Sequence, residues 1–412
     1  MSTRRILVAL IALLSIVVFV GGVSVAGLAY LRFTAQPRAP ELLVVDADRR
    51  LRLLAGNGSE RTLAEDVSPD LFRYPSPAPD GERVAYISQD EDGVALASLH
   101  LRTGERTELY RSRENPPLYL TWSPDSSRIS FLSNRREGGL GVHIVPADGS
   151  AEHDLIGTSA GSSYFAWQPD SSALLLHIGG SSFEDGTVAV YEPGVDGPRS
   201  ELLDPGFFQT PAWSVDGSQF FYVAQPEVTG PLSPDQVESV LTRVAADGSS
   251  PTVLAAEPMA AMLFSRAPTS DHIAYITVGQ AGFGALKVVD ADGTVRTVSR
   301  HDERIPAFFW SPDGDRLAYL TFEAQSAGPP RFTWHVVERT GGAVRDLASF
   351  TPSQAFAGLI NFFDAYALAI DLWSPTSDQI VYGTDEGVYV LDVASGEATR
   401  RADGVLAMWT KR

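Results

Sequence analysis

The sequence contains no cysteine among its 412 residues. This absence excludes disulfide bonds, a thiol nucleophile, an iron–sulfur cluster held by thiolates, and lipid attachment through cysteine. The compartment stays open, because disulfides are common outside the cytoplasm but are not required there.

Basic residues are scarce and unevenly placed. The chain has 32 lysines and arginines against 51 aspartates and glutamates, a net charge of −19. The first 38 residues hold four arginines and no acid, so residues 39–412 carry 28 basic and 51 acidic side chains, a net charge of −23. A body this acidic repels nucleic acid and anionic lipid head groups. We therefore expect no nucleic-acid partner and favour neutral or basic partner surfaces, although solubility alone also accounts for the charge.

Motifs of catalysis and cofactor binding are also sparse. No glycine-rich phosphate loop or dinucleotide fingerprint is present, and the seven histidines are scattered without metal-ligand spacing. Residues 157–161 (Gly-Thr-Ser-Ala-Gly) match the serine hydrolase pattern, but we expect them in a loop before a strand, without the strand–turn–helix context that this chemistry needs. We expect no catalytic residue, no metal site and no cofactor.

One long hydrophobic run lies near the N-terminus. Residues 6–31 contain no charge and follow Arg4 and Arg5. This run exceeds the roughly 20 residues needed to cross a bilayer, and the arginines should remain in the cytoplasm. We predict a cytoplasmic stub and signal-anchor helix over residues 1–31, in contact with lipid of the cytoplasmic membrane through residues 6–31. A linker over residues 32–40 and an extracytoplasmic body follow; the alternative is a secreted protein, cleaved near Ala26.

A repeated turn organises the rest of the sequence. In residues 310–319 (Trp-Ser-Pro-Asp-Gly-Asp-Arg-Leu-Ala-Tyr), proline presets φ, aspartate can bond the turn backbone and glycine accepts a positive φ. The position of this aspartate recurs at residues 80, 125, 170, 216, 269, 313 and 376, at intervals of 45, 45, 46, 53, 44 and 63 residues. Such a period is typical of one four-stranded propeller blade.

The repeat resembles that of TolB-type propellers over roughly residues 70–412: an aromatic residue, then Ser-Pro-Asp-Gly, then an alternating strand that ends in an aromatic residue. The resemblance implies a propeller that engages other envelope proteins, and it transfers no residue-level site. We assign the repeated tryptophans to packing between blades rather than to a carbohydrate platform, and the aspartates to turns. These structural positions are Trp122, Asp125, Trp167, Asp170, Trp213, Asp216, Trp310, Asp313, Trp373 and Trp409.

The two ends of the repeat region complete each other. Residues 405–409 look like an innermost strand, whereas residues 42–45, 51–54 and 61–63 look like outer strands with no inner one before them. Joining residues 41–66 with residues 403–412 closes the ring and removes exposed sheet edges. We predict an all-β fold over residues 41–412, a closed β-propeller of eight four-stranded antiparallel blades. Seven blades remain if the N-terminal strands only extend a neighbouring blade.

The predicted topology separates two faces. The Ser-Pro-Asp-Gly turns and the glycine hairpins are short and emerge on one face, the turn face. Loops of variable length emerge on the opposite one, the variable-loop face, at residues 178–186, 225–236, 322–331 and 351–371. Long loops gathered on one face of a rigid scaffold are where binding usually occurs.

Residues 351–371 are the longest departure from the period, and their apolar residues recur at helical spacing. This helical insertion is either a lid that plugs the channel or a docking helix with Asn361 and Asp364 pointing outward. Deleting it should leave the protein folded but abolish partner capture. A basic pair lies in another loop of the same face. Our candidate partner-binding residues are Phe356, Asn361, Phe363, Asp364, Tyr366, Arg135 and Arg136.

These features predict a membrane-anchored, extracytoplasmic and non-catalytic propeller that binds an envelope or membrane protein, or a peptide, through its variable-loop face. The alternative is a sensor or enzyme that binds a small molecule or glycan in the central channel. Charged side chains converging at the channel mouth would favour the alternative, and a plugged channel would favour the first hypothesis.

Overall fold

The computed structural model describes residues 40–411 except 69, 180–185, 201, 206–208, 225–237, 259, 280–281 and 327. The predicted signal anchor and almost all of the predicted linker lie outside these residues, as do the loop at 225–236 and most of the loop at 178–186. In the part of the chain that is described, no helix is long and apolar enough to span a bilayer.

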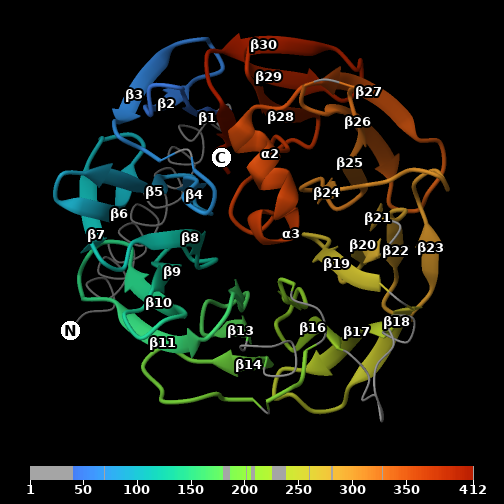
Figure 1. The fold of residues 1–412 in the computed structure, drawn as a ribbon, viewed down its shortest axis with the longest axis horizontal. Helices are drawn as coiled ribbons and strands as arrows, with labels where there is room; N and C mark the ends of the chain where they lie inside the picture. Colours follow the sequence, from blue (N-terminus) through green and yellow to red (C-terminus); the bar gives the residue numbers. More distant parts are fainter. Residues whose placement is uncertain are drawn as a thin grey trace, which may run out of the picture. The chain divides into compact units, whose positions relative to one another are not determined.

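The described strands form eight antiparallel sheets that follow one another around a centre (Figure 1). This confirms the all-β, eight-bladed prediction. Blade 1 joins the two ends of the chain, and blades 2 to 8 follow in sequence order. Blade 2 contains β4 (Ser76–Pro77), β5 (Arg83–Asp90), β6 (Gly93–His100) and β7 (Arg106–Ser112), and blade 3 contains β8 (Pro117–Trp122), β9 (Arg128–Asn134), β10 (Leu140–Pro146) and β11 (Asp154–Ser159).

The remaining blades follow the same plan with local departures. Blade 4 contains β12 (Ser163–Trp167), β13 (Leu174–Ile178) and β14 (Thr187–Tyr191), and blade 5 contains β15 (Ala212–Trp213), β16 (Gln219–Ala224), β17 (Glu238–Ala245) and β18 (Thr252–Pro258). Blade 6 contains β19 (Ala260–Arg266), β20 (Ile273–Gly279), β21 (Gly282–Phe283), β22 (Lys287–Val289) and β23 (Val295–Thr297). Blade 7 contains β24 (Ala307–Trp310), β25 (Arg316–Glu323), β26 (Arg331–Glu338) and β27 (Arg345–Phe350), and blade 8 contains β28 (Gln379–Thr384), β29 (Gly387–Asp392) and β30 (Ala398–Ala402).

Blades 4 and 8 have three regular strands among the described residues, but single bridges extend both sheets. In blade 8, Trp373 pairs with Ile380 and takes the innermost position. In blade 4, Val188 pairs with Leu203 on the outer side. Each of these two sheets therefore has a fourth, paired segment even though no full fourth strand forms.

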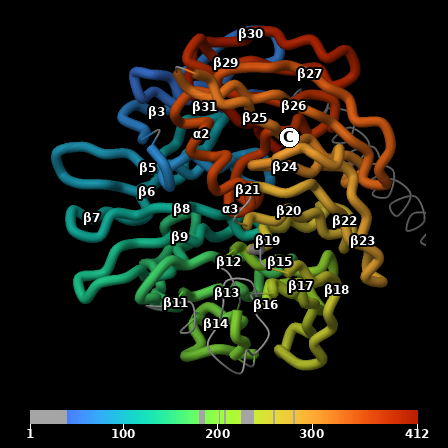
Figure 2. Tube along the Cα trace, turned by 45° about the vertical axis from the view of Figure 1, so that its right-hand side comes forward, coloured from blue at the N-terminus to red at the C-terminus, as the bar shows by residue number. Residues whose placement is uncertain are grey.

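Blade 1 closes the ring. It contains β1 (Leu42–Val45), β2 (Leu51–Leu54), β3 (Glu60–Ala64) and β31 (Leu406–Trp409). Strand β31 pairs antiparallel with β1, with Leu42 opposite Trp409 and Val45 opposite Leu406. The start and end of the propeller accordingly lie side by side, blue against red, in both views (Figures 1 and 2). The split blade agrees with the pairing expected from the two ends of the sequence.

The repeated tryptophans link each blade to the one before it. Their rings line the blade interfaces, and each indole N–H that has a partner donates to the innermost or second strand of the preceding blade. The donor–acceptor pairs are Trp122 with the carbonyl of Ser76 (2.8 Å), Trp167 with Oγ of Ser130 (2.9 Å), Trp213 with the carbonyl of Ala166 (3.0 Å), Trp310 with the carbonyl of Ser265 (3.0 Å) and Trp373 with the carbonyl of Phe309 (3.2 Å). Each of these buried indole N–H groups thus has a hydrogen-bond acceptor while its ring packs between blades.

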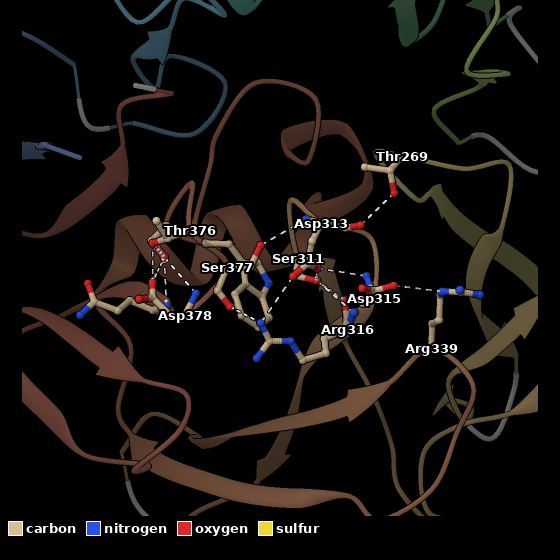
Figure 3. Close-up of polar contacts among 12 residues, drawn as sticks. Thr269, Ser311, Asp313, Asp315, Arg316, Arg339, Thr376, Ser377 and Asp378 are labelled. Atoms are coloured by element: carbon tan, nitrogen blue, oxygen red, sulfur yellow. Dashed lines mark hydrogen bonds and ion pairs between the residues drawn. The ribbon is translucent and has the colours of Figure 1, made fainter. Parts of the chain in front are cut away.

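The turns form a second connection between blades, shown for blades 6 to 8 in Figure 3. Inside the turn of blade 7, the amide of Asp315 donates to the carboxylate of Asp313 (3.1 Å), and Gly314 has a φ of 77°. Across the turn face, the amide of Asp313 donates to Ser377 Oγ (3.1 Å), and Thr269 Oγ1 donates to the Asp313 carbonyl (2.9 Å). Burial alone would raise the pKa of Asp313, but hydrogen bonds from the Ser311 hydroxyl and the Asp315 amide, together with the charge of Arg316, outweigh it and lower the pKa.

Two short helices occupy the centre of the ring in Figure 1: α2 (Gln354–Asn361) and α3 (Phe363–Tyr366). Ser353 caps α2 by accepting a hydrogen bond from the Phe356 amide (3.1 Å). The helical prediction for residues 351–371 therefore holds, but a break at Phe362, whose φ of −131° is not helical, divides it into two pieces. This break changes which side chains face inward.

Candidate functional site

The helical insertion plugs the channel. Its groups bond to residues of several blades: Tyr74 OH donates to the Ala355 carbonyl (2.8 Å), and Tyr119 OH donates to the Ala365 carbonyl (3.2 Å). On the opposite side of the ring, the Thr210 amide donates to Asp364 Oδ2 (3.2 Å). A segment tied to blades 2, 3 and 5 at once agrees with the lid interpretation more closely than with a free docking helix.

Most of the candidate residues on this insertion are buried in the described part of the chain. Phe356 and Phe363 are at most 1% exposed, and Tyr366 is 3% exposed. Asp364 is 6% exposed, so the expectation that it points outward was wrong. A single helix was assumed, whereas the break at Phe362 restarts the helical register and turns Asp364 inward. Asn361, the last residue of α2, is exposed as expected.

The basic pair lies in the β9–β10 hairpin on the variable-loop face. Arg135 Nη2 lies 2.6 Å from Glu137 Oε2, and Arg136 pairs with Glu114. Exposed ion pairs of this kind contribute little to stability and exchange easily. Both arginines can therefore leave these partners for another acid, but they are distant in the sequence and in the fold from the insertion.

A groove of about 570 Å³ runs beside α2 on the variable-loop face. Ala357 and Ile360 of α2 form one side, and Phe322 and Phe332 of the β25–β26 hairpin face them, with ring centroids 6.0 Å apart. The remaining lining residues are mostly prolines and polar residues at the rim: Phe283, Pro306, Pro329, Pro330, Pro352, Gln354, Asn361 and Asp385. Of the predicted candidates, only Asn361 belongs to this groove. Phe283, Phe322 and Phe332, which lie in or beside loops of this face, are the sequence signal that could have indicated the groove.

A second hollow, the central cavity, lies on the other side of the plug and has a volume of about 700 Å³. Its floor includes Asp364, Ala367, Leu368 and Asp371 of the insertion. Its wall contains the repeated tryptophans and the turn prolines, which places its opening on the turn face; these are Trp122, Trp167, Trp213, Trp310, Trp373, Pro79, Pro124, Pro169, Pro268, Pro312 and Pro375. The plug separates this cavity from the variable-loop face.

Charged groups at the cavity differ in how they are neutralised. Lys411 Nζ lies 3.4 Å from Asp371 Oδ2. Arg266 donates to carbonyls of its own turn, including that of Ser270 (3.2 Å), and burial lowers its pKa. Asp364 forms no ion pair with any described residue. Burial raises the pKa of Asp364, although the amides of Thr210 and Ala365 partly oppose this.

Asp364 gives a pH-dependent stability prediction. Its pKa is higher in the folded than in the unfolded chain, so the wild-type protein loses stability as pH rises from about 4, the ordinary value for aspartate, through the folded pKa. At pH 8, the free energy of unfolding of Asp364→Asn should therefore exceed that of wild type by on the order of 1–3 kcal/mol. Urea denaturation of the two proteins measures this difference. The difference should vanish near pH 4. Asp196→Asn, at an exposed hairpin, is the control, and an equal gain in both variants would contradict the assignment.

Two hydrogen-bonded groups that resemble catalytic sites involve residues of the sheets. Ser159 of the Gly-x-Ser-x-Gly segment ends strand β11 rather than lying in a loop, and its buried hydroxyl is 3.0 Å from the carbonyl of Gly161. On blade 7, His335 Nε2 lies 2.7 Å from Thr321 Oγ1, and its Nδ1 lies 2.9 Å from Asp346. None of these residues lines either hollow. Among the described residues, no group of three or more acidic or histidine side chains is placed to hold a metal ion.

Comparison with known proteins agrees with this geometry. No family model matches the chain. The chain is 40% identical over 85 residues to the Tol-Pal system protein TolB of Nitrosococcus oceani, a match that covers 19% of this chain and 18% of that protein. The described residues form a TolB-like β-propeller. The chain thus spans less than a fifth of this TolB relative, so the relative's whole-protein role is not transferred.

Solved structures support the propeller fold. A prolyl endopeptidase structure aligns with a TM-score of 0.55 and 13% identity, over 83% of this chain and 51% of that one. The C-terminal WD40 domain of Sif2 aligns with a TM-score of 0.53 and 14% identity, over 81% of this chain and 84% of that one. Propellers of both peptidases and other proteins share the architecture, so function rests on the sites of this chain.

Proposed function

We propose that this protein is a membrane-anchored, extracytoplasmic and non-catalytic TolB-like propeller that holds a segment of another envelope or membrane protein on its variable-loop face. The observation that carries the proposal is the groove beside α2. It lies on the face where the loops vary, and its lining comes from blades 6, 7 and 8 together with the insertion. The plug closes the channel behind it, which leaves a shallow binding surface rather than a reaction chamber.

The chemistry of the groove indicates the kind of segment it would hold. Ala357 and Ile360 on one wall, and phenylalanine side chains on the facing wall, favour apolar side chains of an extended peptide. At the rim, Asp385 and its neighbour Glu386 are exposed acids, and the body of the protein carries a net charge of −23. A basic residue beside the apolar ones would complement this rim and speed association. The proposed occupant is thus an extended apolar segment with a flanking lysine or arginine.

The proposed location rests on the sequence. Residues 6–31 are long and apolar enough for a bilayer span, and Arg4 and Arg5 precede them. A propeller tethered by a short linker to the outer surface of the cytoplasmic membrane would meet other proteins of that membrane. Protease accessibility of the propeller in spheroplasts checks this orientation.

Charge reversal at the rim tests the groove. Asp385→Arg and Asn361→Arg should each reduce capture of partner proteins from the membrane fraction by about tenfold or more, or ~1.4 kcal/mol, because both place a cation where a basic segment would dock. Capture is measured by cross-linking from the variable-loop face followed by mass spectrometry. Asp196→Arg makes the same charge change as Asp385→Arg, but at an exposed turn-face hairpin, and should leave capture unchanged. Equal capture by all three variants would refute the groove as the binding surface.

A further inference from the structure

We propose that the central cavity on the turn face binds an organic cation, a primary or quaternary ammonium group carried on an apolar body. The ammonium group would lie against Asp364 on the floor, and the apolar body would lie against the tryptophan wall. This inference is independent of the proposed function, because the insertion separates the cavity from the groove and the two open on opposite faces.

The wall of the cavity presents aromatic carbon rather than polar groups. Trp122, Trp167, Trp213, Trp310 and Trp373 all line it, and each indole N–H already bonds to the preceding blade. The parts of these rings that border the cavity are therefore carbon; each of the five tryptophans is at most 8% exposed because its ring packs between blades, and an aromatic ring attracts cations over its face. The structure already uses this attraction once, since the guanidinium of Arg316 lies 5.5 Å from the Trp373 ring centroid.

The floor of the cavity contains an acidic side chain, Asp364, that forms no ion pair with a described residue. The two basic residues that line the cavity are engaged elsewhere: Lys411 pairs with Asp371 (3.4 Å), and Arg266 bonds to carbonyls of its own turn. Asp364 accepts a hydrogen bond from the Thr210 amide (3.2 Å), and hydrogen bonds from the Thr210 side chain and from amides of its own helix also act on it, but no described cation neutralises it. A buried carboxylate in this position is stabilised when a positive ligand enters, because the ligand replaces the lost hydration with a direct ion pair.

The same lining disfavours the other ligand classes. A sugar needs many hydrogen-bond partners, yet the Thr121 hydroxyl is already 2.7 Å from Ser130 Oγ, and most of the lining is proline and aromatic carbon. An anion would meet the acids of the floor and a body with a net charge of −23. The volume of about 700 Å³ lies within the range of small-molecule sites. An organic cation is the ligand class that satisfies both the wall and the floor.

Choline and its uncharged carbon isostere, in which a tert-butyl group replaces the trimethylammonium group, provide a matched test. Binding to the full-length protein is measured by calorimetry and by tryptophan fluorescence. We expect choline to bind at least tenfold more tightly than the isostere, and its affinity to rise with pH as Asp364 loses its proton. Equal affinities for the two probes, or no saturable binding of choline, would overturn the proposal.

Variants assign the binding to the cavity. Asp364→Asn should reduce choline affinity at least tenfold while leaving the weak binding of the isostere unchanged. Leu368→Lys places a tethered cation on the floor from an exposed position and should block choline as well. Asp196→Asn is the control for a lost surface charge. Choline binding that survives both floor variants contradicts the proposal, whereas the groove variants Asp385→Arg and Asn361→Arg should leave it intact.

Discussion

Phe363→Ala should cost the protein about 3–5 kcal/mol of unfolding free energy, the range for a large aromatic side chain removed from a packed core. Phe363 is 1% exposed, and its ring centroid lies 4.8 Å from that of Phe308 and 6.1 Å from that of Phe309. These contacts join the insertion to blade 7, so the truncation leaves a cavity at the centre of the ring. Urea denaturation followed by tryptophan fluorescence measures the loss.

Leu368→Ala is the matched control in the same segment. Leu368 is 40% exposed at the floor of the central cavity, so its truncation should cost less than about 1 kcal/mol. Similar losses for the two variants would mean that the insertion does not belong to the core.

The burial of Phe356, Leu359 and Phe363 also changes the expectation for a larger deletion. From the sequence we expected that removing residues 351–371 would leave the protein folded and abolish only partner capture. The structure instead predicts that this deletion unfolds the propeller.

Ending the chain at Gly404 should prevent folding altogether. The truncation removes β31, whose side chains Leu406 and Met408 are fully buried and whose backbone pairs with β1. Removing one buried aliphatic side chain typically lowers the free energy of unfolding by about 2–5 kcal/mol. Losing Leu406, Met408 and Trp409 together therefore approaches the whole stability of a native protein, typically about 5–15 kcal/mol. The edge of β1 would also be left unpaired and prone to association.

A chain that ends at Thr410 is the control for this truncation. It keeps β31 and the hydrogen bond from the Thr410 amide to the Glu41 carbonyl (2.9 Å). Near-ultraviolet circular dichroism and size-exclusion chromatography should show a native propeller for this control and an expanded or aggregated chain for the Gly404 truncation. A compact, cooperative Gly404 truncation would show that blade 1 is an accessory and that seven blades suffice.

The two faces of the propeller divide the proposed activities. The variable-loop face carries the groove and, on the far side of the plug, the turn face opens into the central cavity. The insertion contributes Ile360 and Asn361 to the groove and Asp364 and Leu368 to the cavity, so it borders both hollows. A ligand in one hollow would therefore contact a segment that also borders the other. Measuring partner capture with and without choline separates independent sites from coupled ones.

Local chemistry explains why much of the fold was predictable. The Ser-Pro-Asp-Gly turn needs only neighbouring residues to form, so its spacing in the chain reports the blades directly, as at Asp313 and Gly314. The closing pair was also accessible, because residues 42–45 lacked an inner strand and residues 405–409 lacked outer ones. Strand alternation and turn residues are both short-range signals.

By itself, then, the sequence determined an acidic, cysteine-free chain of repeated blades, closed by its own two ends. The tertiary structure alone decided the sites. Phe283, Phe322 and Asp385 come from three successive blades and meet only when these blades pack side by side. The break at Phe362 turned Asp364 from the expected surface into the floor of a cavity, since helical spacing cannot show where one helix stops and the next begins. Contacts between distant segments depend on the closed ring, and no local pattern encodes them.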